Sequence, residues 1–298
     1  MVLNVAVVGL GSMGYGMAQS LLRAGHKVHG ADVNAAAVSR LVAEGGQAAS
    51  AADTAPLADV LVVVVLNAAQ TETVLFGADG WAARMRKGAT IISCATVAPS
   101  FARDMAARCA GLGLHYLDAP ISGGAAKAAA GKLSIMASGS PAAFAGARPA
   151  LDAMAETVFE LGSEPGAGSA MKAVNQLLAG VHIAAMGEAL TFGMTQGLEP
   201  GRIVEVISRC AGTSWMFENR APHVVDGDYT PRSAINIWPK DLGIVLGIAA
   251  EARFGAPLTA AALQQFMAAA GSGLGGEDDA AVAKVYARNA GLTLPGGA

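Results

Sequence analysis

Short apolar runs alternate with helix-like segments through the first half of the chain. Apolar runs of strand length are typical of strands buried on both faces of a sheet. The strands expected from them are Val5–Val8, Lys27–Ala31, Val60–Leu66, Ala89–Ser93, His115–Asp118, Leu133–Ala137 and Thr157–Glu160. The helices expected between them include Tyr15–Ala24, Ala35–Glu44, Ala69–Leu75, Ser100–Ala110 and Pro141–Met154. This alternation predicts βαβ units, and therefore an α/β domain with a doubly wound, mostly parallel sheet that helices cover on both faces.

The pattern changes after Leu161. Residues 162–168 form a glycine-rich, turn-prone junction, and no convincing strand follows it. Helices are expected at Ser169–Gln196, Gly201–Ala211, Ser214–Val225, Asp241–Ala252, Leu258–Ala269 and Asp278–Asn289. We therefore expect an α/β domain over residues 1–163 and an all-α domain over residues 164–298, joined by the long helix that begins at Ser169. The Gly/Pro-rich tail from Leu294 is expected to be frayed.

Composition and charge restrict the class of protein. Apolar residues make up 53% of the 298 residues and charged residues 14%, which predicts much buried surface and is compatible with a subunit interface. The net charge of −3 offers no general attraction to nucleic acids or anionic membranes. The longest aliphatic run, Val60–Leu66, is too short to span a bilayer, and the first strand begins too early to leave room for a signal peptide. We therefore expect a cytoplasmic protein with no nucleic-acid or membrane partner.

Cysteine and histidine usage favours neither a disulfide framework nor a metal centre. Cys94, Cys109 and Cys210 are an odd number and form no Cys-x-x-Cys pair, which is typical of reduced thiols. The five histidines lack the spacing of metal ligands, so no metal site is expected.

The most informative motif is the glycine-rich turn between the first expected strand and the first expected helix. Gly9 allows a tight turn, Gly11 lets the backbone approach a pyrophosphate, and Gly14 lets the helix pack against the strand. The helix N-terminus, with Ser12 and Met13, offers unpaired N–H groups to phosphates. The alternative is a βα turn that binds nothing. The setting of strand, turn and helix favours dinucleotide binding, with these five residues as cofactor contacts.

An acidic residue supports the same interpretation and bears on which dinucleotide binds. Asp32 follows Gly14 by eighteen residues, at the end of the second expected strand. A carboxylate there accepts hydrogen bonds from ribose hydroxyls and repels a 2′-phosphate, and no arginine precedes Arg40 to neutralise one. We therefore expect NAD rather than NADP. The competing role for Asp32 is helix capping, for which Asn34 is better placed.

Two further segments offer groups that could bind and oxidise an alcohol. In the segment Asp118–Gly124, which follows a strand, Ser122 supplies a hydroxyl, and Gly123 and Gly124 expose backbone N–H groups to a carboxylate. The alternative is an ordinary Pro/Gly loop.

In the segment Gly166–Gln176, Lys172, Asn175 and Gln176 share one face of a helix that is otherwise apolar. Burial would lower the pKa of Lys172 and suit the amine to proton transfer. The alternative is a surface lysine that extends its amine to water.

Together these motifs resemble the β-hydroxyacid dehydrogenase family, which includes 3-hydroxyisobutyrate dehydrogenase and tartronate semialdehyde reductase. The resemblance covers essentially the whole chain and rests on residues 9–14, 118–124 and 166–176 and on Lys240-Asp241-Leu242. It implies a Rossmann domain, a long helix and a helical domain for substrate binding and oligomerisation, assembled as a homodimer or homotetramer.

The resemblance also implies residue roles. Lys172 would be the catalytic acid/base. Ser122, Gly123 and Gly124 would hold the substrate, Asn175 and Gln176 would orient it, and Lys240 would contact substrate and cofactor. The cofactor contacts implied outside the glycine turn are Leu66, Asn67, Thr71 and Thr96.

The substrate expected from the resemblance is a small hydroxy acid. Gln176 stands where many members have Asn, and Asn67 stands where many have Pro. The Gln variant resembles the tartronate semialdehyde side of the family, which argues against a dedicated 3-hydroxyisobutyrate enzyme. Residues 66–72 and 211–220 resemble the subgroup that oxidises L-threonate at C2 to a 2-keto acid, with Trp215 and Phe217 expected as core packing. Tartronate semialdehyde reduction, 3-hydroxyisobutyrate oxidation and a non-catalytic cofactor-binding sensor remain alternatives.

Overall fold

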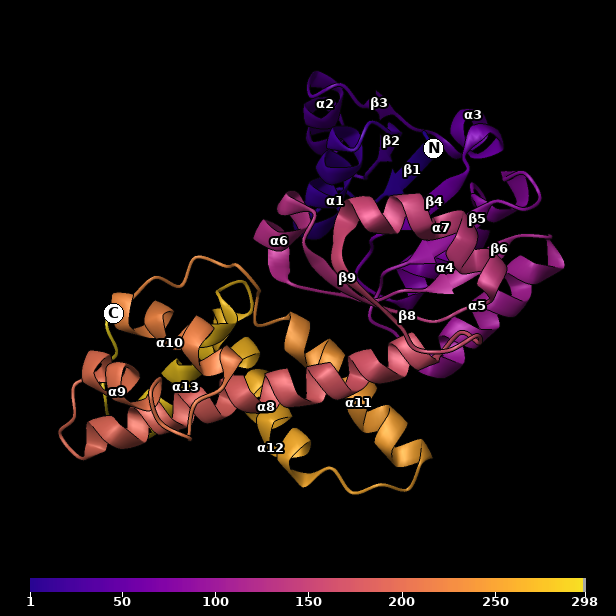
Figure 1. Ribbon diagram of the computed structural model, residues 1–298. Helices are drawn as coiled ribbons and strands as arrows, with labels where there is room; N and C mark the ends of the chain where they lie inside the picture. The colour runs from indigo at the N-terminus through magenta and orange to yellow at the C-terminus, as the bar shows by residue number, and fades with distance from the viewer. Residues whose placement is uncertain (297–298) are drawn as a thin grey trace. The chain divides into compact units, whose positions relative to one another are not determined.

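The computed structural model describes residues 1–296, and the chain divides into two compact units, Met1–Lys172 and Ala173–Ala298. The first unit contains a six-stranded sheet of order β3-β2-β1-β4-β5-β6 in which all neighbours are parallel (Figure 1). Its strands are β1 (Asn4–Val8), β2 (Lys27–Ala31), β3 (Gln47–Ala48), β4 (Val60–Val63), β5 (Thr90–Ser93) and β6 (His115–Asp118). The strand order reverses between β1 and β4, and in such sheets ligands bind outside the carboxyl ends of the strands at this point.

Both faces of this sheet are buried, which explains why its strands are continuously apolar. Val5 and Val7 of β1 pack in one core with residues of α1 (Ser12–Arg23) and α7 (Pro141–Met154), and α2 (Ala35–Ala43) adds Leu41. The intervening Ala6 and Val8 pack in a second core with α4 (Ala68–Phe76) and α5 (Pro99–Gly111). The doubly wound architecture expected from the sequence is confirmed.

A smaller sheet follows β6 in the same unit. Its order is β7-β8-β9, with β7 (Ile121–Ser122) antiparallel and β9 (Ala155–Glu160) parallel to β8 (Leu133–Ala137). The sequence patterns missed the short elements β3, α3 (Ala51–Thr54), β7 and α6 (Gly124–Ala130). These elements are too short to carry a periodic signal of their own, and the strands among them are defined by their pairing partners.

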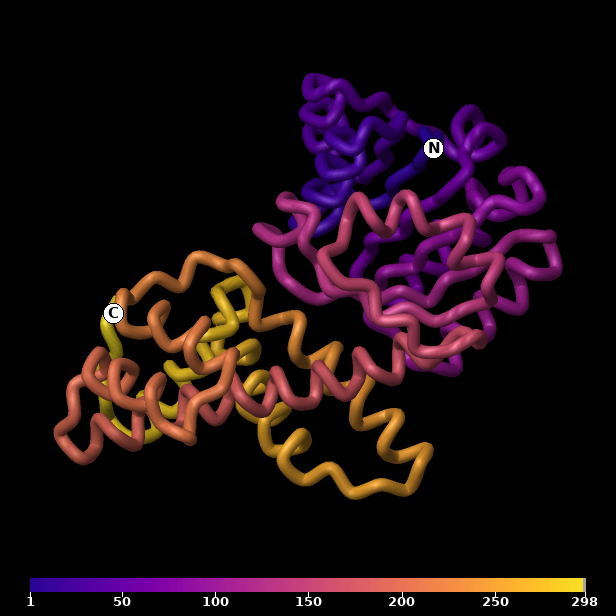
Figure 2. The backbone as a smooth tube through the Cα atoms, in the orientation of Figure 1, coloured from indigo at the N-terminus to yellow at the C-terminus, as the bar shows by residue number. Residues whose placement is uncertain are grey.

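The second unit is helical. The long helix α8 (Ala167–Thr195) begins in the first unit and continues into the second, where α9 (Pro200–Ile207), α10 (Trp215–Asp226), α11 (Ile237–Glu251), α12 (Pro257–Ala269) and α13 (Ala283–Asn289) follow (Figure 2). Its core gathers Ile183 and Leu190 of α8 with Phe217, Trp238 and Phe266 from the other helices. No strand occurs in described residues 173–296, so the expected all-α character is confirmed.

Among the described helices, only α8 is long and apolar enough to cross a bilayer by length and composition. Half of its most apolar window is buried inside the structure. Met186 and its neighbours Ile183 and Leu190 lie in the core of the second unit. These contacts identify α8 as a core helix.

The expectation of a frayed tail is wrong for its first residues. The side chain of Leu294 is only 5% exposed, and the carbonyl of Pro295 accepts a hydrogen bond of 3.3 Å from the hydroxyl of Tyr229. The apolar side chain of Leu294 finds a place in the core of the second unit. Residues 297 and 298 lie outside the described part of the chain.

The environments of the three thiols predict selective alkylation. Burial raises the pKa of both Cys94 and Cys109 to about 12, whereas Cys210 is exposed. At about pH 8, iodoacetamide should therefore modify Cys210 in the native protein and reach the other two only after denaturation, because the thiolate is the nucleophile. Peptide mass spectrometry measures the modified positions. The Cys210→Ser variant should stay unmodified while native, and modification of Cys94 at a comparable rate would contradict the burial described here.

Candidate active site

The glycine-rich turn has one glycine that the fold does not require. A Cβ atom at Gly9 would lie 2.1 Å from the carbonyl oxygen of Val64, and one at Gly14 would lie 1.9 Å from the carbonyl oxygen of Gly9. A Cβ atom at Gly11 would meet no protein atom within 4 Å. Gly11 is the N-cap of α1, so this open space adjoins the N–H groups at the start of the helix. The turn therefore fits a pyrophosphate that approaches the backbone at Gly11.

Asp32 lies beside this turn at the end of β2. Its carboxylate accepts hydrogen bonds from the backbone N–H groups of Leu10, at 2.5 Å, and Asn34, at 2.7 Å. The N-cap of α2 is Asn34, whose side chain accepts from the N–H of Ala36 at 3.0 Å. Capping therefore belongs to Asn34, and Asp32 is fixed next to the turn with acceptor capacity left for a ribose.

The other expected cofactor contacts follow the carboxyl ends of β4 and β5. Asn67 caps α4 by accepting from the N–H of Gln70 at 2.9 Å, and the buried hydroxyl of Thr71 donates to the carbonyl of Asn67 at 2.9 Å. Leu66 is exposed and Thr96, after β5, is partly buried. Leu66 and Asn67 follow β4 and Thr96 follows β5, on the side of the sheet where ligands bind in doubly wound folds, whereas Thr71 lies inside α4; Asn67 and Thr71 already have local structural roles.

Lys172 lies in the second turn of α8, within the first unit, and is only 8% exposed. Its Nζ atom donates a hydrogen bond of 2.9 Å to the carbonyl oxygen of Ile121. The alternative of a surface lysine is therefore wrong. Ile121 and Ser122 form β7, and α6 begins at Gly124, so part of the segment is regular structure, while its role in substrate binding stays a prediction. The structure thus brings the amine of Lys172 to the backbone of the segment that contains Ser122, Gly123 and Gly124.

The first turn of α8 rests on a buried carboxylate, Asp118, at the end of β6. Asp118 is 1% exposed and accepts hydrogen bonds from the N–H groups of Gly166, at 2.9 Å, and Ser169, at 2.8 Å. The hydroxyl of Ser169 donates to the same carboxylate at 2.7 Å. Burial raises the pKa of Asp118, and these hydrogen bonds oppose that rise. Sequence reasoning quoted Asp118 within a motif but gave it no role.

In the second unit, four polar side chains form a chain of contacts. The amide of Asn175 donates to Oε1 of Gln176 at 2.9 Å, and the amide of Gln176 donates to the carboxylate of Asp241. The Nζ atom of Lys240 lies 2.5 Å from Oδ1 of Asp241, which is 2% exposed. The carboxylate of Asp241 therefore contacts two of the residues assigned to the site from the family resemblance. Its place in the Lys240-Asp241-Leu242 motif was the signal that could have identified it.

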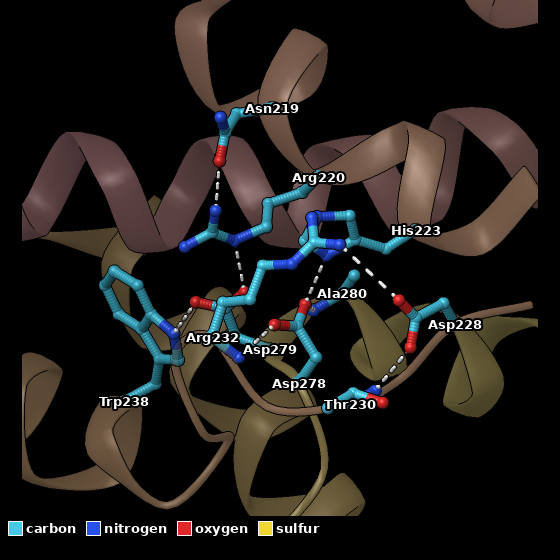
Figure 3. A network of polar contacts seen from close by, with 10 residues as sticks. All are labelled: Asn219, Arg220, His223, Asp228, Thr230, Arg232, Trp238, Asp278, Asp279 and Ala280. Carbon is cyan, nitrogen blue, oxygen red and sulfur yellow. Dashed lines mark hydrogen bonds and ion pairs between the residues drawn. The ribbon is translucent and has the colours of Figure 1, made fainter. Parts of the chain in front are cut away.

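A second polar network fixes the start of α11 (Figure 3). The buried carboxylate of Asp279 accepts from Nε of Arg220 at 2.5 Å and from the indole N–H of Trp238 at 3.0 Å. Burial raises the pKa of Asp279, and the positive charge of Arg220 opposes that rise. Its neighbour Asp278 bonds His223 at 2.8 Å. Because Trp238 lies two residues before Lys240, this network holds the helical turn that carries Lys240.

Two further sequence expectations have structural outcomes. Phe217 is buried in the core of the second unit, as expected, whereas Trp215 is 64% exposed, so its assignment to core packing is wrong. Trp215 is the first residue of α10, directly after the N-cap Ser214, and points away from the core. Among residues 1–296, no group of three or more His, Cys, Asp or Glu side chains is arranged to hold a metal ion.

Two family models together match most of the chain. Residues 4–162 match the NAD-binding domain of 6-phosphogluconate dehydrogenase. Residues 166–286 match a model described as the NAD-binding region of NADP-dependent 3-hydroxyisobutyrate dehydrogenase.

Similar proteins align over nearly the full chain. The chain is 51% identical to an L-threonate dehydrogenase of Cupriavidus necator, covering 98% of each chain, and 47% identical to one of Escherichia coli K12, covering 98% of this chain and 97% of the relative. A crystal structure described as 3-hydroxyisobutyrate dehydrogenase from Salmonella typhimurium has a TM-score of 0.90 and 50% identity, covering 95% of this chain and 99% of that one.

The contrast between Gly11 and Gly14 predicts opposite effects of the same substitution. The free energy of unfolding of Gly11→Ala should lie within about 1 kcal/mol of the parent value, because the added Cβ meets no protein atom. The same variant should bind NADH at least about tenfold more weakly. Gly14→Ala should lose about 1–3 kcal/mol or more of unfolding free energy, because its Cβ overlaps the carbonyl of Gly9. Thermal denaturation and NADH fluorescence titration measure the two effects. Unchanged NADH affinity in Gly11→Ala would exclude this turn as the pyrophosphate site.

Proposed function

This chain belongs to the 3-hydroxyisobutyrate dehydrogenase-like family of β-hydroxyacid dehydrogenases, and we propose that it oxidises L-threonate at C2, with NAD, to 2-dehydro-L-erythronate. The observation that carries the chemistry is the buried amine of Lys172, which bonds the carbonyl of Ile121 beside Ser122. The similarity that supports the substrate is to the L-threonate dehydrogenases of Cupriavidus necator and Escherichia coli.

In the proposed reaction, different residues of the chain bind the substrate and accept its proton. The hydroxyl of Ser122 and the N–H groups of Gly123 and Gly124 bind the substrate carboxylate. Lys172, in its neutral form, accepts the proton of the C2 hydroxyl as the C–H bond breaks. Bound NAD, held at the turn of residues 9–14 and by Asp32, supplies the acceptor for the hydride. The proton therefore ends on Lys172, and C2 becomes a carbonyl carbon.

Polar side chains favour a polyhydroxylated substrate over a branched aliphatic one. Asn175 and Gln176 lie one turn beyond Lys172 on α8, and we assign them to the hydroxyl groups of the substrate. Asn175 bonds Gln176 and Gln176 bonds Asp241, and the hydroxyl groups of the substrate can add to these hydrogen bonds, whereas a branched aliphatic group cannot. This argument matters because a relative of comparable identity is described as a 3-hydroxyisobutyrate dehydrogenase. The contact roles of Lys240, Leu66, Asn67, Thr71 and Thr96 remain predictions from the family resemblance.

The preference for NAD over NADP is part of the proposal. The Asp32 carboxylate next to the glycine turn would repel a 2′-phosphate, and the following Val33 and Asn34 offer no positive charge to bind one. We also propose a cytoplasmic homodimer or homotetramer that has no nucleic-acid or membrane partner, in keeping with its low charge and large apolar content.

The role of Lys172 predicts a specific loss of turnover. Lys172→Ala should lower kcat for L-threonate by about 10²–10⁴-fold, because the proton acceptor is lost while the cofactor site is unchanged. NADH affinity should stay within about threefold of the parent value, since Lys172 is not part of the glycine turn. Stopped-flow or steady-state absorbance at the NADH band gives kcat, and fluorescence titration gives the affinity. Near-normal turnover would remove Lys172 from the mechanism.

A substrate panel distinguishes the proposed reaction from its alternatives. The value of kcat/KM should be highest for L-threonate among L-threonate, D-glycerate and 3-hydroxyisobutyrate. Preference for 3-hydroxyisobutyrate, with no activity on four-carbon sugar acids, would replace the proposed substrate. Tight NADH binding without turnover of any hydroxy acid would instead support a cofactor-binding sensor.

The charge of Asp32 predicts the cofactor preference. The parent enzyme should show a higher kcat/KM with NAD than with NADP. Asp32→Asn should lower the ratio of kcat/KM with NAD to kcat/KM with NADP by about tenfold or more, because repulsion of the 2′-phosphate is removed. Asn keeps an acceptor oxygen for the N–H of Leu10, so the turn should remain folded. Equal use of both cofactors by the parent enzyme would contradict the assignment.

A further inference from the structure

The carboxylate of Asp118 accepts hydrogen bonds from the start of α8, not from the segment 119–124 that follows it in the chain. Its oxygens accept hydrogen bonds from the backbone N–H groups of Gly166 and Ser169, from the hydroxyl of Ser169 and, at 3.4 Å, from the hydroxyl of Ser138. A buried carboxylate is costly unless its oxygens are hydrogen-bonded, and bonds from backbone N–H groups to an ionised acceptor are among the strong ones. The negative charge also lies at the positive end of the α8 dipole. Asp118 is therefore an anchor for the first turn of α8.

Backbone contacts make this anchor close-fitting. The N–H of Gly168 donates to the hydroxyl of Ser138 at 2.9 Å, and Ser138 itself pairs with the backbone of Asp118. A Cβ atom at Gly168 would lie 2.4 Å from the carbonyl oxygen of Met136 and 2.6 Å from that of Asp118. The first turn of α8 therefore touches the backbone at the ends of β6 and β8 directly. A helix held this closely has little freedom to rotate or slide.

The segment of residues 118–121 contacts α8 a second time, at Lys172. Ile121, three residues after Asp118, accepts the hydrogen bond from the Nζ atom of Lys172. Lys172 in turn lies three residues after Ser169, which is bonded to Asp118. Residues 118–121 and 169–172 are thus joined at both ends. The place of the amine depends on its own bond to Ile121 and on the helical turn that Asp118 holds.

We propose that Asp118 is a positioning residue for Lys172, which holds the first turn of α8 so that the amine meets the bond to be oxidised. This inference rests on the proposed function of Lys172 as proton acceptor. Reactions of this kind are sensitive to small displacements: an error of about 1 Å in a reacting group can cost about 10²-fold in rate. Loss of the carboxylate should therefore lower kcat, with little effect on binding of substrate or cofactor.

A double-mutant cycle tests the proposal on the full-length protein. Asp118→Asn keeps the size of the side chain but removes its charge and one acceptor oxygen, and should lower kcat by about tenfold or more with KM and NADH affinity within about threefold. In the Lys172→Ala background, the same substitution should change the residual kcat by less than about twofold, because no amine is left to position. Equal losses in both backgrounds, or no loss in either, would overturn the proposal.

A matched control separates positioning from general stability. Asp59 also accepts a hydrogen bond from a backbone N–H, that of Asn4 at 2.7 Å. Asp59 directly precedes β4, however, so it lies at the amino ends of the parallel strands and Asp118 at the carboxyl ends. Asp59→Asn should lower the melting temperature and leave kcat unchanged. If Asp59→Asn lowered kcat as much as Asp118→Asn at matched loss of stability, the effect of Asp118 would be merely structural, and the proposal would fail.

A milder variant covers the case in which Asp118→Asn does not fold. Ser169→Ala removes one donor to the carboxylate and leaves the charge in place. It should lower kcat by about two- to tenfold, again only when Lys172 is present, and increase hydrogen exchange of a peptide covering residues 163–172. Unchanged kcat and exchange would refute the inference. If the parent enzyme oxidises no hydroxy acid, the proposed function fails first, and hydrogen exchange still reports whether Asp118 holds the helix.

Discussion

The attachment of α8 to the carboxyl edge of the parallel sheet is the constraint on which the chemistry depends. A helix that begins at a sheet edge must satisfy its first N–H groups, and here the buried carboxylate of Asp118 does so together with the hydroxyl of Ser138. Because Gly168 has no side chain, the helix approaches the strand backbone closely enough for these bonds to form. Lys172 lies in the next turn of the helix after this attachment, and Asn175 and Gln176 follow on the same helix.

Buried carboxylates fix several of the helical turns that carry or adjoin candidate functional residues. Asp118 holds the turn before Lys172, Asp241 contacts Gln176 and Lys240, and Asp279 bonds the indole of Trp238. In each case several donors compensate the loss of hydration. Such groups are weak contributors to net stability, but they define one orientation of the side chains they bond. A chain with only 14% charged residues places several of them in its interior.

The fold and the family define the class of reaction, and the side chains narrow the substrate. The Rossmann unit accounts for a dinucleotide, since the glycine turn leaves open space at Gly11 and keeps Asp32 beside it. Similarity to L-threonate dehydrogenases at 51% and 47% identity supports that substrate, although a solved structure at 50% identity carries the name of 3-hydroxyisobutyrate dehydrogenase. In the proposal, the polar pair Asn175 and Gln176, which bond each other and Asp241, is assigned to the hydroxyl groups of L-threonate.

The sequence by itself determined the elements that local patterns encode: the buried strands of the parallel sheet, the glycine turn at residues 9–14, the long helix that carries Lys172, and the helical character of the second unit. Periodicity and turn chemistry are properties of neighbouring residues, so they can be read without a structure. Only the tertiary structure revealed the two-residue strand β7, the exposure of Trp215, the burial of Leu294, and the bonds made by Asp118 and Asp241. The bonds of Asp118 and Asp241 join groups 48 to 65 residues apart in the chain, and a local pattern contains no information about which distant groups will meet.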